Sequence, residues 1–197
     1  MSFTFRLVDA VEDAPVLHSW VSQEYARFWG MVGCAEQDVL EEYSKIAATD
    51  HHQAYLGLDG GVPAFLMERY LPEASPLADV YEVQPGDIGM HLLVSPPKDD
   101  PRPGYTTAVM QAVMTELFAD PANRRIVVEP DARNHKIHAL NEKVGFRPHG
   151  VVTLPAVDPS EDHKQGLLSF CTREDFLSTL TPILASAAAL LTRGETQ

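Results

Sequence analysis

The sequence predicts a mixed α/β domain built around one sheet. Two observations predict this class: strand patterns follow one another in the front half of the chain, and strands alternate with helices in the back half. The chain has 197 residues, of which 45% are hydrophobic, so one core can form without disulfides or a structural metal. No repeat or linker divides it. We therefore expect one domain over residues 1–180 and a helical tail over 181–197.

The front half holds most of the consecutive strands. Strands are predicted where β-branched and aromatic residues alternate with polar ones, and helices where apolar residues recur every three or four positions. Asp59-Gly60-Gly61 is typical of a hairpin between two strands. The predicted elements are a strand over 3–8, a helix ending near 23, an irregular aromatic stretch over 25–31, a helix over 36–48, strands over 52–58 and 62–69, and a long loop over 71–85.

The back half alternates strands with helices, and its boundaries are marked by proline and glycine. A proline-dense loop precedes a helix with a continuous apolar face, and Val144-Gly145 ends the next helix. The predicted elements are a strand over 87–94, a loop over 95–104, a helix over 105–118, a strand over 125–129, a helix over 134–143, strands over 146–154 and 166–171 around an acidic loop over 158–165, and a helix from 174 onward.

Charge and targeting signals limit the class of partner. Fifteen Lys and Arg against 28 Asp and Glu give a net charge of −13, which disfavours binding to nucleic acid or to anionic lipid. The first residues lack the apolar core of a secretory signal. The longest apolar stretch, 183–191, is shorter than the ~20 residues that span a bilayer. We expect a cytoplasmic protein with no nucleic-acid or membrane partner.

Cysteine and histidine spacing argues against a metal site. Cys34 and Cys171 have no metal-binding spacing and are expected to be buried or half-buried thiols in a reducing compartment. The pairs His51-His52 and His135 with His138 have no carboxylate or cysteine at a spacing typical of a metal-binding motif. We therefore expect no metal.

One candidate site is the loop that leads into the helix at residue 105. A glycine at such a junction lets backbone N–H groups approach a phosphate, and the helix N-terminus adds partial positive charge. Gly104 stands at this place, followed by Tyr105 and Thr106, and Arg102 could add a counter-charge. The alternative is an ordinary helix start with no ligand.

A second candidate is the strand Gly86-Asp87-Ile88-Gly89-Met90-His91. Alternation places Asp87, Gly89 and His91 on one face, and the glycines indicate a close approach to the backbone. Histidine is a plausible general base because its ordinary pKa lies near neutral pH. The alternative is a histidine that is merely hydrogen-bonded.

A third candidate follows the strand over 125–129. Glu129-Pro130-Asp131-Ala132-Arg133-Asn134 stands just after the carboxyl end of a buried strand, where α/β folds place their sites. Asn134 is expected to cap the following helix. Asp131 is less obviously needed for capping and is the better candidate for chemistry.

Together these segments resemble the GNAT acyltransferase fold, which implies a mixed sheet with splayed central strands. The siderophore-biosynthesis branch of that family is the most similar, and its desferrioxamine-type hydroxydiamine acyltransferases above all. The resemblance covers residues 3–176. It is carried by Phe28-Trp29-Gly30-Met31, Gly86-Asp87-Ile88-Gly89-Met90-His91-Leu92-Leu93, Glu129-Pro130-Asp131-Ala132-Arg133-Asn134, Leu154-Pro155, Ala64-Phe65-Leu66-Met67-Glu68-Arg69-Tyr70 and Leu168-Ser169-Phe170-Cys171-Thr172-Arg173.

The resemblance implies N-acylation of a hydroxylamine or a long amine by acetyl-CoA or succinyl-CoA. It implies acid/base roles for His91 and Asp131 without saying which is the base. The residues it implies for binding the acyl-CoA are Leu93, Arg102, Gly104, Tyr105, Thr106, Asn134 and Asn141.

Three features depart from the family pattern. Asn141 stands where many members have a tyrosine that protonates the leaving thiolate, and the phosphate loop is reduced. Residues 158–165 look like an insertion, and Lys164 within it is left outside the expected site.

The acceptor is the least determined part of this interpretation. An N-hydroxylated diamine such as N-hydroxycadaverine carries a second ammonium, which a carboxylate or an aromatic face would bind. The residues expected to contact this acceptor are Trp29, Glu68, Tyr81 and Asp87, with Glu82 as a further carboxylate. An N-hydroxylysine would instead need an arginine, Arg27 or Arg69, for its carboxylate.

Three broader alternatives remain at this stage. The chain could be a general polyamine or amino-acid acetyltransferase, or a non-catalytic module that binds acyl-CoA. The apolar side of its last helix could also form a homodimer.

Overall fold

The structure is a computed structural model that describes residues 2–97, 100, 102–156 and 163–180. The strands are β1 (Phe3–Leu7), β2 (His52–Asp59), β3 (Val62–Tyr70), β4 (Asp87–Val94), β5 (Arg125–Val128), β6 (Arg147–Pro155) and β7 (His163–Thr172). The α-helices are α1 (Ala10–Val21), α2 (Glu36–Ala47), α3 (Tyr105–Ala119) and α4 (His135–Lys143). Short 3-10 helices are η1 (Glu24–Trp29), η2 (Pro72–Ala74) and η3 (Pro76–Asp79).

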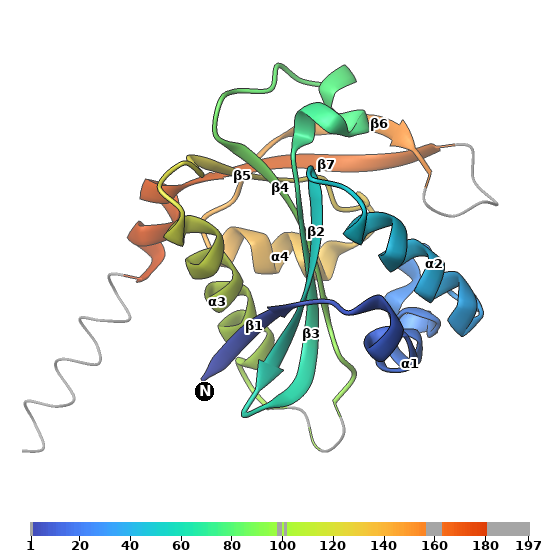
Figure 1. Ribbon diagram of the computed structural model, residues 1–197. Coiled ribbons are helices and arrows are strands. Elements are labelled where there is room, and N and C mark those ends of the chain that lie inside the picture. Colours follow the sequence, from blue (N-terminus) through green and yellow to red (C-terminus); the bar gives the residue numbers. More distant parts are fainter. Residues whose placement is uncertain (1, 98–99, 101, 157–162, 181–197) are drawn as a thin grey trace, which may run out of the picture.

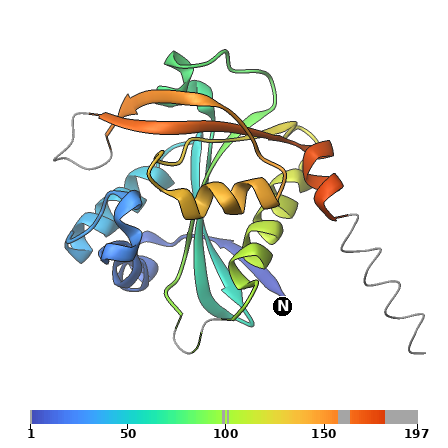
Figure 2. The same ribbon diagram turned by 180° about the vertical axis from the view of Figure 1, so that it is seen from behind.

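All the strands above belong to one mixed sheet in the order β1-β2-β3-β4-β5-β7-β6. β4 and β5 pair in parallel, and the other neighbours in this order pair antiparallel. Figure 1 shows α1 and α2 on one side of the central strands and α3 and α4 on the other, and Figure 2 shows the same layers from behind. The fold class predicted from the sequence is confirmed.

Each face of the sheet has its own apolar core, because alternate residues of a strand point to opposite faces. On the α3/α4 face, α3 buries residues at helical spacing against Phe65, Ile88 and Met90. On the α1/α2 face, Val39 and Tyr43 of α2 pack with residues of β2 and β3. Even-numbered residues of β4 therefore lie in the α3/α4 core, and Gly89 and His91 point to the α1/α2 face.

The central strands separate part-way along their length. The pairing of β4 with β5 ends at Gly89 and Val127, whereas β4 continues alongside β3 as far as Val94. β5 itself ends at Val128. This is the splay that the fold predicts, and it leaves the second half of β4 without a strand on its β5 side.

The structure corrects some predicted boundaries. The acidic loop expected over 158–165 is shorter, because β7 already begins at His163 and contains Lys164. η2 and η3 occupy part of the long loop over 71–85, and η1 occupies the irregular aromatic stretch. Residues 173–180 are helical, and the predicted tail over 181–197 lies outside the described residues.

Two further expectations concern cysteines and membrane spans. Cys34 is half-buried and Cys171 is buried, and both are free thiols, as predicted. Within the described part of the chain, no helix has the length and apolar character needed to cross a membrane.

Candidate active site

A pocket of roughly 1000 Å³ lies where β4 and β5 separate. Its lining comes from both faces of the sheet: Trp29 and Tyr43 lie on the α1/α2 face, and Met110 and Asn141 come from the α3 and α4 helices. The pocket therefore runs through the opening between the two strands. Two molecules could enter it from opposite faces and meet at His91.

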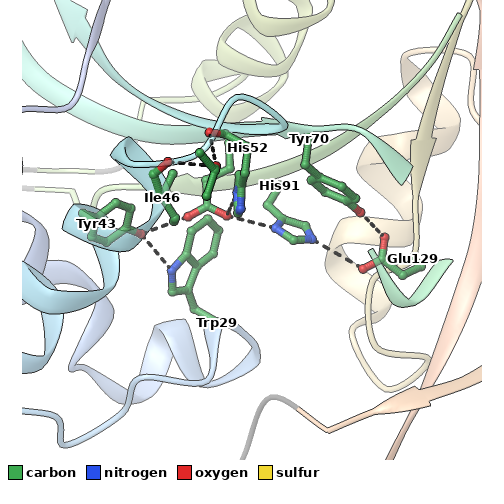
Figure 3. Close-up of polar contacts among 9 residues, drawn as sticks. Trp29, Tyr43, Ile46, His52, Tyr70, His91 and Glu129 are labelled. Atoms are coloured by element: carbon green, nitrogen blue, oxygen red, sulfur yellow. Dashed lines mark hydrogen bonds and ion pairs between the residues drawn. The ribbon is translucent and has the colours of Figure 1, made fainter. Parts of the chain in front are cut away.

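His91 lies between two buried carboxylates (Figure 3). Its Nδ1 is 3.1 Å from Oε2 of Glu68, and its Nε2 is 3.4 Å from Oε1 of Glu129. The His91 side chain is 40% exposed, whereas those of Glu68 and Glu129 are 8% and 7% exposed. Of these three groups, the imidazole is therefore the one that a molecule in the pocket can reach.

Each carboxylate accepts further hydrogen bonds. Tyr43 Oη donates to Oε1 of Glu68 at 3.1 Å, and His52 Nε2 lies 3.3 Å from Oε2. Glu129 accepts from Tyr70 Oη on Oε2 at 2.9 Å, and from Lys164 Nζ on Oε1 at 3.2 Å. In each carboxylate, therefore, one oxygen faces the imidazole and the other accepts from a tyrosine hydroxyl, which fixes the two negative charges on either side of His91.

Aromatic rings enclose the imidazole. The Tyr70 ring lies 4.9 Å from that of His91, and the Trp29 ring meets His91 edge-on at 6.1 Å. Trp29 Nε1 donates to Tyr43 Oη at 3.3 Å, which links the tryptophan to the carboxylate cluster. The aromatic enclosure limits the orientations available to the His91 ring.

These contacts shift three pKa values. Burial lowers the pKa of His91, but hydrogen bonds and negative charge from Glu129 and Glu68 outweigh burial and raise it to about 9. Burial raises the pKa of Glu68, but His52 and His91 lower it to about 2. Burial likewise raises the pKa of Glu129, but the hydrogen bond and positive charge of His91 lower it to about 2. His91 is therefore an imidazolium in the free protein at neutral pH, and it must lose a proton before it can act as a base.

The sequence builds this cluster through strand alternation. Glu68 and Tyr70 stand two residues apart on β3 and so share the α1/α2 face with His91 of the neighbouring β4. Gly89 makes room for the ring: a Cβ at this position would lie 2.2 Å from Tyr70 ring atoms. The close approach expected at this glycine is therefore that of the Tyr70 side chain.

Asp131 lines the same pocket but has different partners. Oδ1 accepts from the backbone N–H and Nε of Arg133 at 2.8 and 2.9 Å, and Oδ2 accepts from Nη2 at 2.7 Å. The hydrogen bonds of Arg133 hold the pKa of Asp131 below its usual value. Asn134 also lines the pocket and precedes α4, but its side chain makes no capping hydrogen bond, so the predicted capping role is wrong.

Asn141 and Leu93 are both brought into the pocket. Asn141 is 4% exposed, and its Oδ1 has no hydrogen-bond partner among the described residues. A buried acceptor without a partner costs free energy unless a ligand supplies a donor. The pantetheine arm of coenzyme A carries amide N–H groups and ends in a thiol, so this atom fits such a ligand.

The N-terminus of α3 lies outside the pocket lining. Gly104 adopts φ 79° there, and no side chain caps the helix, so its first turn can receive an anion. Arg102, the expected counter-charge, already has partners: its Nη2 lies 2.5 Å from Asp59 Oδ2, and its guanidinium stacks 3.9 Å from the Tyr105 ring. A phosphate would compete with Asp59 for Arg102. Thr106 lies in the first turn of the same helix.

The four expected acceptor contacts divide into two groups. Trp29 and Glu68 line the pocket, but Glu68 is occupied by its own donors. Tyr81 and Asp87 are not among the residues that line it. Their side chains bond to each other, and Asp87 also binds Arg125, which lies opposite it in the paired part of β4 and β5.

Several members of the cluster were not predicted from the sequence. Glu129 follows the same buried strand as Asp131, so the argument that selected Asp131 applied to it as well. Tyr70 could have been found from its two-residue spacing to Glu68. Lys164 was missed because its segment was predicted to be a loop. Among the described residues, no group of three or more His, Cys, Asp or Glu side chains could hold a metal ion.

Comparison with known proteins decides the family. A family model described as "Acetyltransferase (GNAT) domain" matches residues 9–154. The chain belongs to the GNAT acetyltransferase family. As a GNAT enzyme it is an acyl-CoA N-acyltransferase, with acyl-CoA as its co-substrate.

Several relatives of this GNAT enzyme act on different acceptors. It is 23% identical over 175 residues to an N-hydroxyputrescine acetyltransferase of Acinetobacter baumannii, covering 89% of this chain and 80% of the relative. It is 26% identical over 180 residues to an N(6)-hydroxylysine O-acetyltransferase of Escherichia coli, covering 89% of this chain and 53% of the relative. It is 27% identical to an aminoglycoside N(6')-acetyltransferase of Klebsiella pneumoniae, covering 78% of each.

Solved structures agree on the fold. An uncharacterized protein from Bacillus halodurans is 30% identical, with a TM-score of 0.80 over 91% of this chain and 88% of that one. The aminoglycoside acetyltransferase AAC(6')-Ib, solved with coenzyme A and kanamycin, has a TM-score of 0.74 at 24% identity over 90% of this chain and 99% of that one.

Proposed function

We propose that this enzyme transfers an acetyl or succinyl group from acyl-CoA to the nitrogen of an N-hydroxylated diamine, such as N-hydroxycadaverine, in hydroxamate siderophore biosynthesis. The observation that carries the proposal is the imidazole of His91, which lies at the opening between β4 and β5 and can be reached from the pocket. Two of the relatives reported above act on N-hydroxylated amines.

The chemistry requires one proton to leave the acceptor nitrogen. As the nitrogen attacks the thioester carbon, the N–C bond forms, the C–S bond breaks, and coenzyme A leaves as a thiolate that takes up a proton. An N-hydroxylated nitrogen is far less basic than an alkylamine, so it arrives neutral and needs only modest help from a base. His91 takes the proton in its deprotonated form, and Nε2 is the ring atom that faces the longer, weaker contact.

His91 is a better base than Asp131 in this geometry. Both oxygens of Asp131 are engaged by Arg133, which stabilises the carboxylate as an anion. We assign Asp131 and Arg133 to the wall of the acceptor pocket rather than to proton transfer. We assign Asn141, on the α4 side of the opening, and Leu93, which packs on the α1/α2 side, to contacts with the acyl-CoA arm. Its phosphates lie at the α3 N-terminus with Arg102.

A diamine fits the charge of the pocket rim better than an amino acid. Asp38, Glu41 and Glu42 of α2 line the pocket, and Lys45 lies 3.7 Å from Glu42. A second ammonium on the acceptor would face this carboxylate-rich helix. We therefore assign the ammonium to these α2 carboxylates, and not to Tyr81 and Asp87, which do not line the pocket.

N-hydroxylysine is the second candidate acceptor, because one relative is named for it. Its carboxylate would need a cation, and Arg27 lines the pocket. Arg69, the other arginine considered, instead donates to Gln53 at 2.7 Å and is not among the lining residues. Of the two arginines considered from the sequence, Arg27 is thus the one that lines the pocket.

A panel of donors and acceptors tests the function. Acetyl-CoA and succinyl-CoA are each combined with N-hydroxycadaverine, cadaverine, N-hydroxylysine and kanamycin, and thiol release is measured. We expect N-hydroxycadaverine to exceed cadaverine about 100-fold or more in kcat/KM, because an amine with a pKa near 10.4 is almost fully protonated at pH 7.4.

Other outcomes of the panel would contradict the proposal. Equal rates with cadaverine would indicate a general polyamine acetyltransferase, and a preference for kanamycin would indicate an aminoglycoside enzyme. Binding of coenzyme A without turnover of any acceptor would indicate a non-catalytic module.

A further inference from the structure

The two carboxylates that flank His91 are surrounded by matching sets of groups. In each, one oxygen accepts from a tyrosine hydroxyl: Tyr43 on Glu68 and Tyr70 on Glu129. The other oxygen faces a nitrogen of His91 together with one further basic side chain. The symmetry means that either carboxylate could orient the imidazole, and each choice leaves a different ring nitrogen free for chemistry.

The further basic side chain breaks the symmetry. On Glu129 it is Lys164, whose Nζ is 3.2 Å from the same Oε1 that faces His91, and whose side chain is only 14% exposed. On Glu68 it is His52, whose charge is not permanent, at 3.3 Å. Glu129 therefore keeps a full positive partner when His91 loses a proton, whereas Glu68 depends far more on the His91 N–H.

The two distances from His91 to the carboxylates also indicate that Glu68 makes the stronger hydrogen bond. Nδ1 of His91 is 3.1 Å from Glu68, within the usual range for an N–H···O bond, and Nε2 is 3.4 Å from Glu129, beyond it. When the imidazolium gives up one proton, the weaker of the two hydrogen bonds should be the one that is lost. Both the lysine and the distances point to Nε2 as the nitrogen that loses it.

We propose that Glu68, and not Glu129, is the positioning residue for His91: it keeps the proton on Nδ1, and Lys164 decides this by occupying Glu129. Nε2 is then the atom that takes the proton from the acceptor nitrogen and passes it to the leaving thiolate, so the ring returns to its starting state. This last clause rests on the proposed function, but the position of the proton in the free protein does not.

The groups that face the cluster come from every element packed against it. They are Glu68 and Tyr70 of β3, His52 of β2, Tyr43 of α2, Glu129 after β5, and Lys164 of β7. Of these, Lys164 is the cation that can be altered without removing an atom that touches His91. It is therefore the most informative position for a test.

NMR of the free protein tests the proposal without substrates. Imidazole ¹⁵N shifts are followed through the titration of His91, whose signals are assigned by their loss in His91→Asn. Above the titration midpoint, we expect the proton on Nδ1 in the wild type. A proton on Nε2 would overturn the proposal, because it would make Glu129 the orienting carboxylate.

Variants at position 164 test the deciding role of the lysine. In Lys164→Met we expect a mixture of the Nδ1–H and Nε2–H forms and a midpoint raised by about one pH unit, since a nearby positive charge is lost. Lys164→Arg should restore both values, and Lys143→Met on the exposed face of α4 is the matched control. An unchanged tautomer and midpoint in Lys164→Met would overturn the role of Lys164.

Kinetics separates this proposal from the proposed function. In Glu68→Gln we expect the midpoint of His91 to fall by about one pH unit because a negative charge is removed, and kcat to fall more than KM rises. If no acceptor in the panel is turned over while the NMR results hold, the function is wrong and the assignment of Glu68 stands. If turnover is found but the proton lies on Nε2, the function stands and Glu68 is not the positioning residue.

Discussion

The same two strands carry two charged clusters of opposite character. Asp87 and Arg125 lie opposite each other where β4 and β5 are still paired, and His91 and Glu129 lie beyond the point where the strands separate. In the first cluster, Arg125 makes two bonds of 2.7 Å to a carboxylate that is 1% exposed. In the second, the imidazole is 40% exposed and one of its contacts is 3.4 Å long.

The difference follows from the backbone. Paired strands fix the separation of their side chains, so a short bidentate ion pair can form and has no room for a ligand. Where the strands separate, the side chains are held by one strand each, and the space between them becomes the pocket. Charge alone therefore does not identify the active site; charge beside an opened strand pair does.

Removal of His91 should have the largest effect on catalysis. If His91 is the base, His91→Ala should reduce the turnover of the folded protein by about 100-fold or more. It should also lower the melting temperature, because Glu68 and Glu129 lose the imidazolium between them. Steady-state thiol release measures the effect, with His135→Ala on the exposed start of α4 as control. A decrease in turnover of less than threefold would show that His91 is not the base. Neither the Asp87 cluster nor the His91 cluster would then have a demonstrated role in catalysis.

Substitution of Asp87 should show the opposite pattern. Asp87→Asn leaves Arg125 without its charged partner, which should lower the free energy of unfolding by about 3 kcal/mol, with turnover retained in the protein that remains folded. Urea denaturation measures it. Arg147→Ala, which breaks an ion pair of a 77% exposed arginine, should cost less than about 1 kcal/mol. If Asp87→Asn loses turnover but keeps the wild-type free energy of unfolding, Asp87 contributes to catalysis rather than to stability.

The smallest expected effect is on stability as a function of pH. The pKa of His91 in the folded protein, about 9, lies above the ordinary value of 6.5, so its protonation stabilises the fold. This contribution is complete below about pH 6.5 and is lost as the pH rises through 9. We expect the free energy of unfolding to fall by about 1 kcal/mol over this range, since solvent screens the exposed ring.

Two variants check the pH prediction. His91→Asn should lack this part of the decrease, whereas His135→Asn should keep it. Urea denaturation at intervals between pH 6 and 9.5 measures both. Identical curves for wild type and His91→Asn would show that the cluster does not hold the imidazolium in the folded state.

Local patterns predicted most of the fold. β4 begins and ends where its alternation predicts. The apolar face predicted for the helix over 105–118 is buried in α3 and consists of Val109, Met110, Val113, Met114, Leu117 and Phe118. Lys164 shows where such patterns fail, because β7 extends through an acidic segment whose composition is typical of a loop. Pairing with β6 supplies the hydrogen bonds that composition alone does not predict: Leu154 and Lys164 are partners in that ladder.

Part of the site was also predictable. His91 and Asp131 were selected from their places within or after a strand, and Asn141 was selected from the family resemblance; all three line the pocket. Asp87 was selected because it shares a strand face with His91. Four residues along a strand span about 13 Å, however, and the separation of β4 from β5 falls between them. A shared face is therefore necessary for a shared site but not sufficient.

The sequence by itself determined which residues point to the same side of each strand, since alternation is a property of the local backbone. It also determined the family, through motifs that lie within single segments. Only the tertiary structure decided that Glu68, His91, Glu129 and Lys164 meet, because they come from four separate segments of the chain. The ionisation of His91 depends on charges brought together by folding, and so no local pattern could have given it.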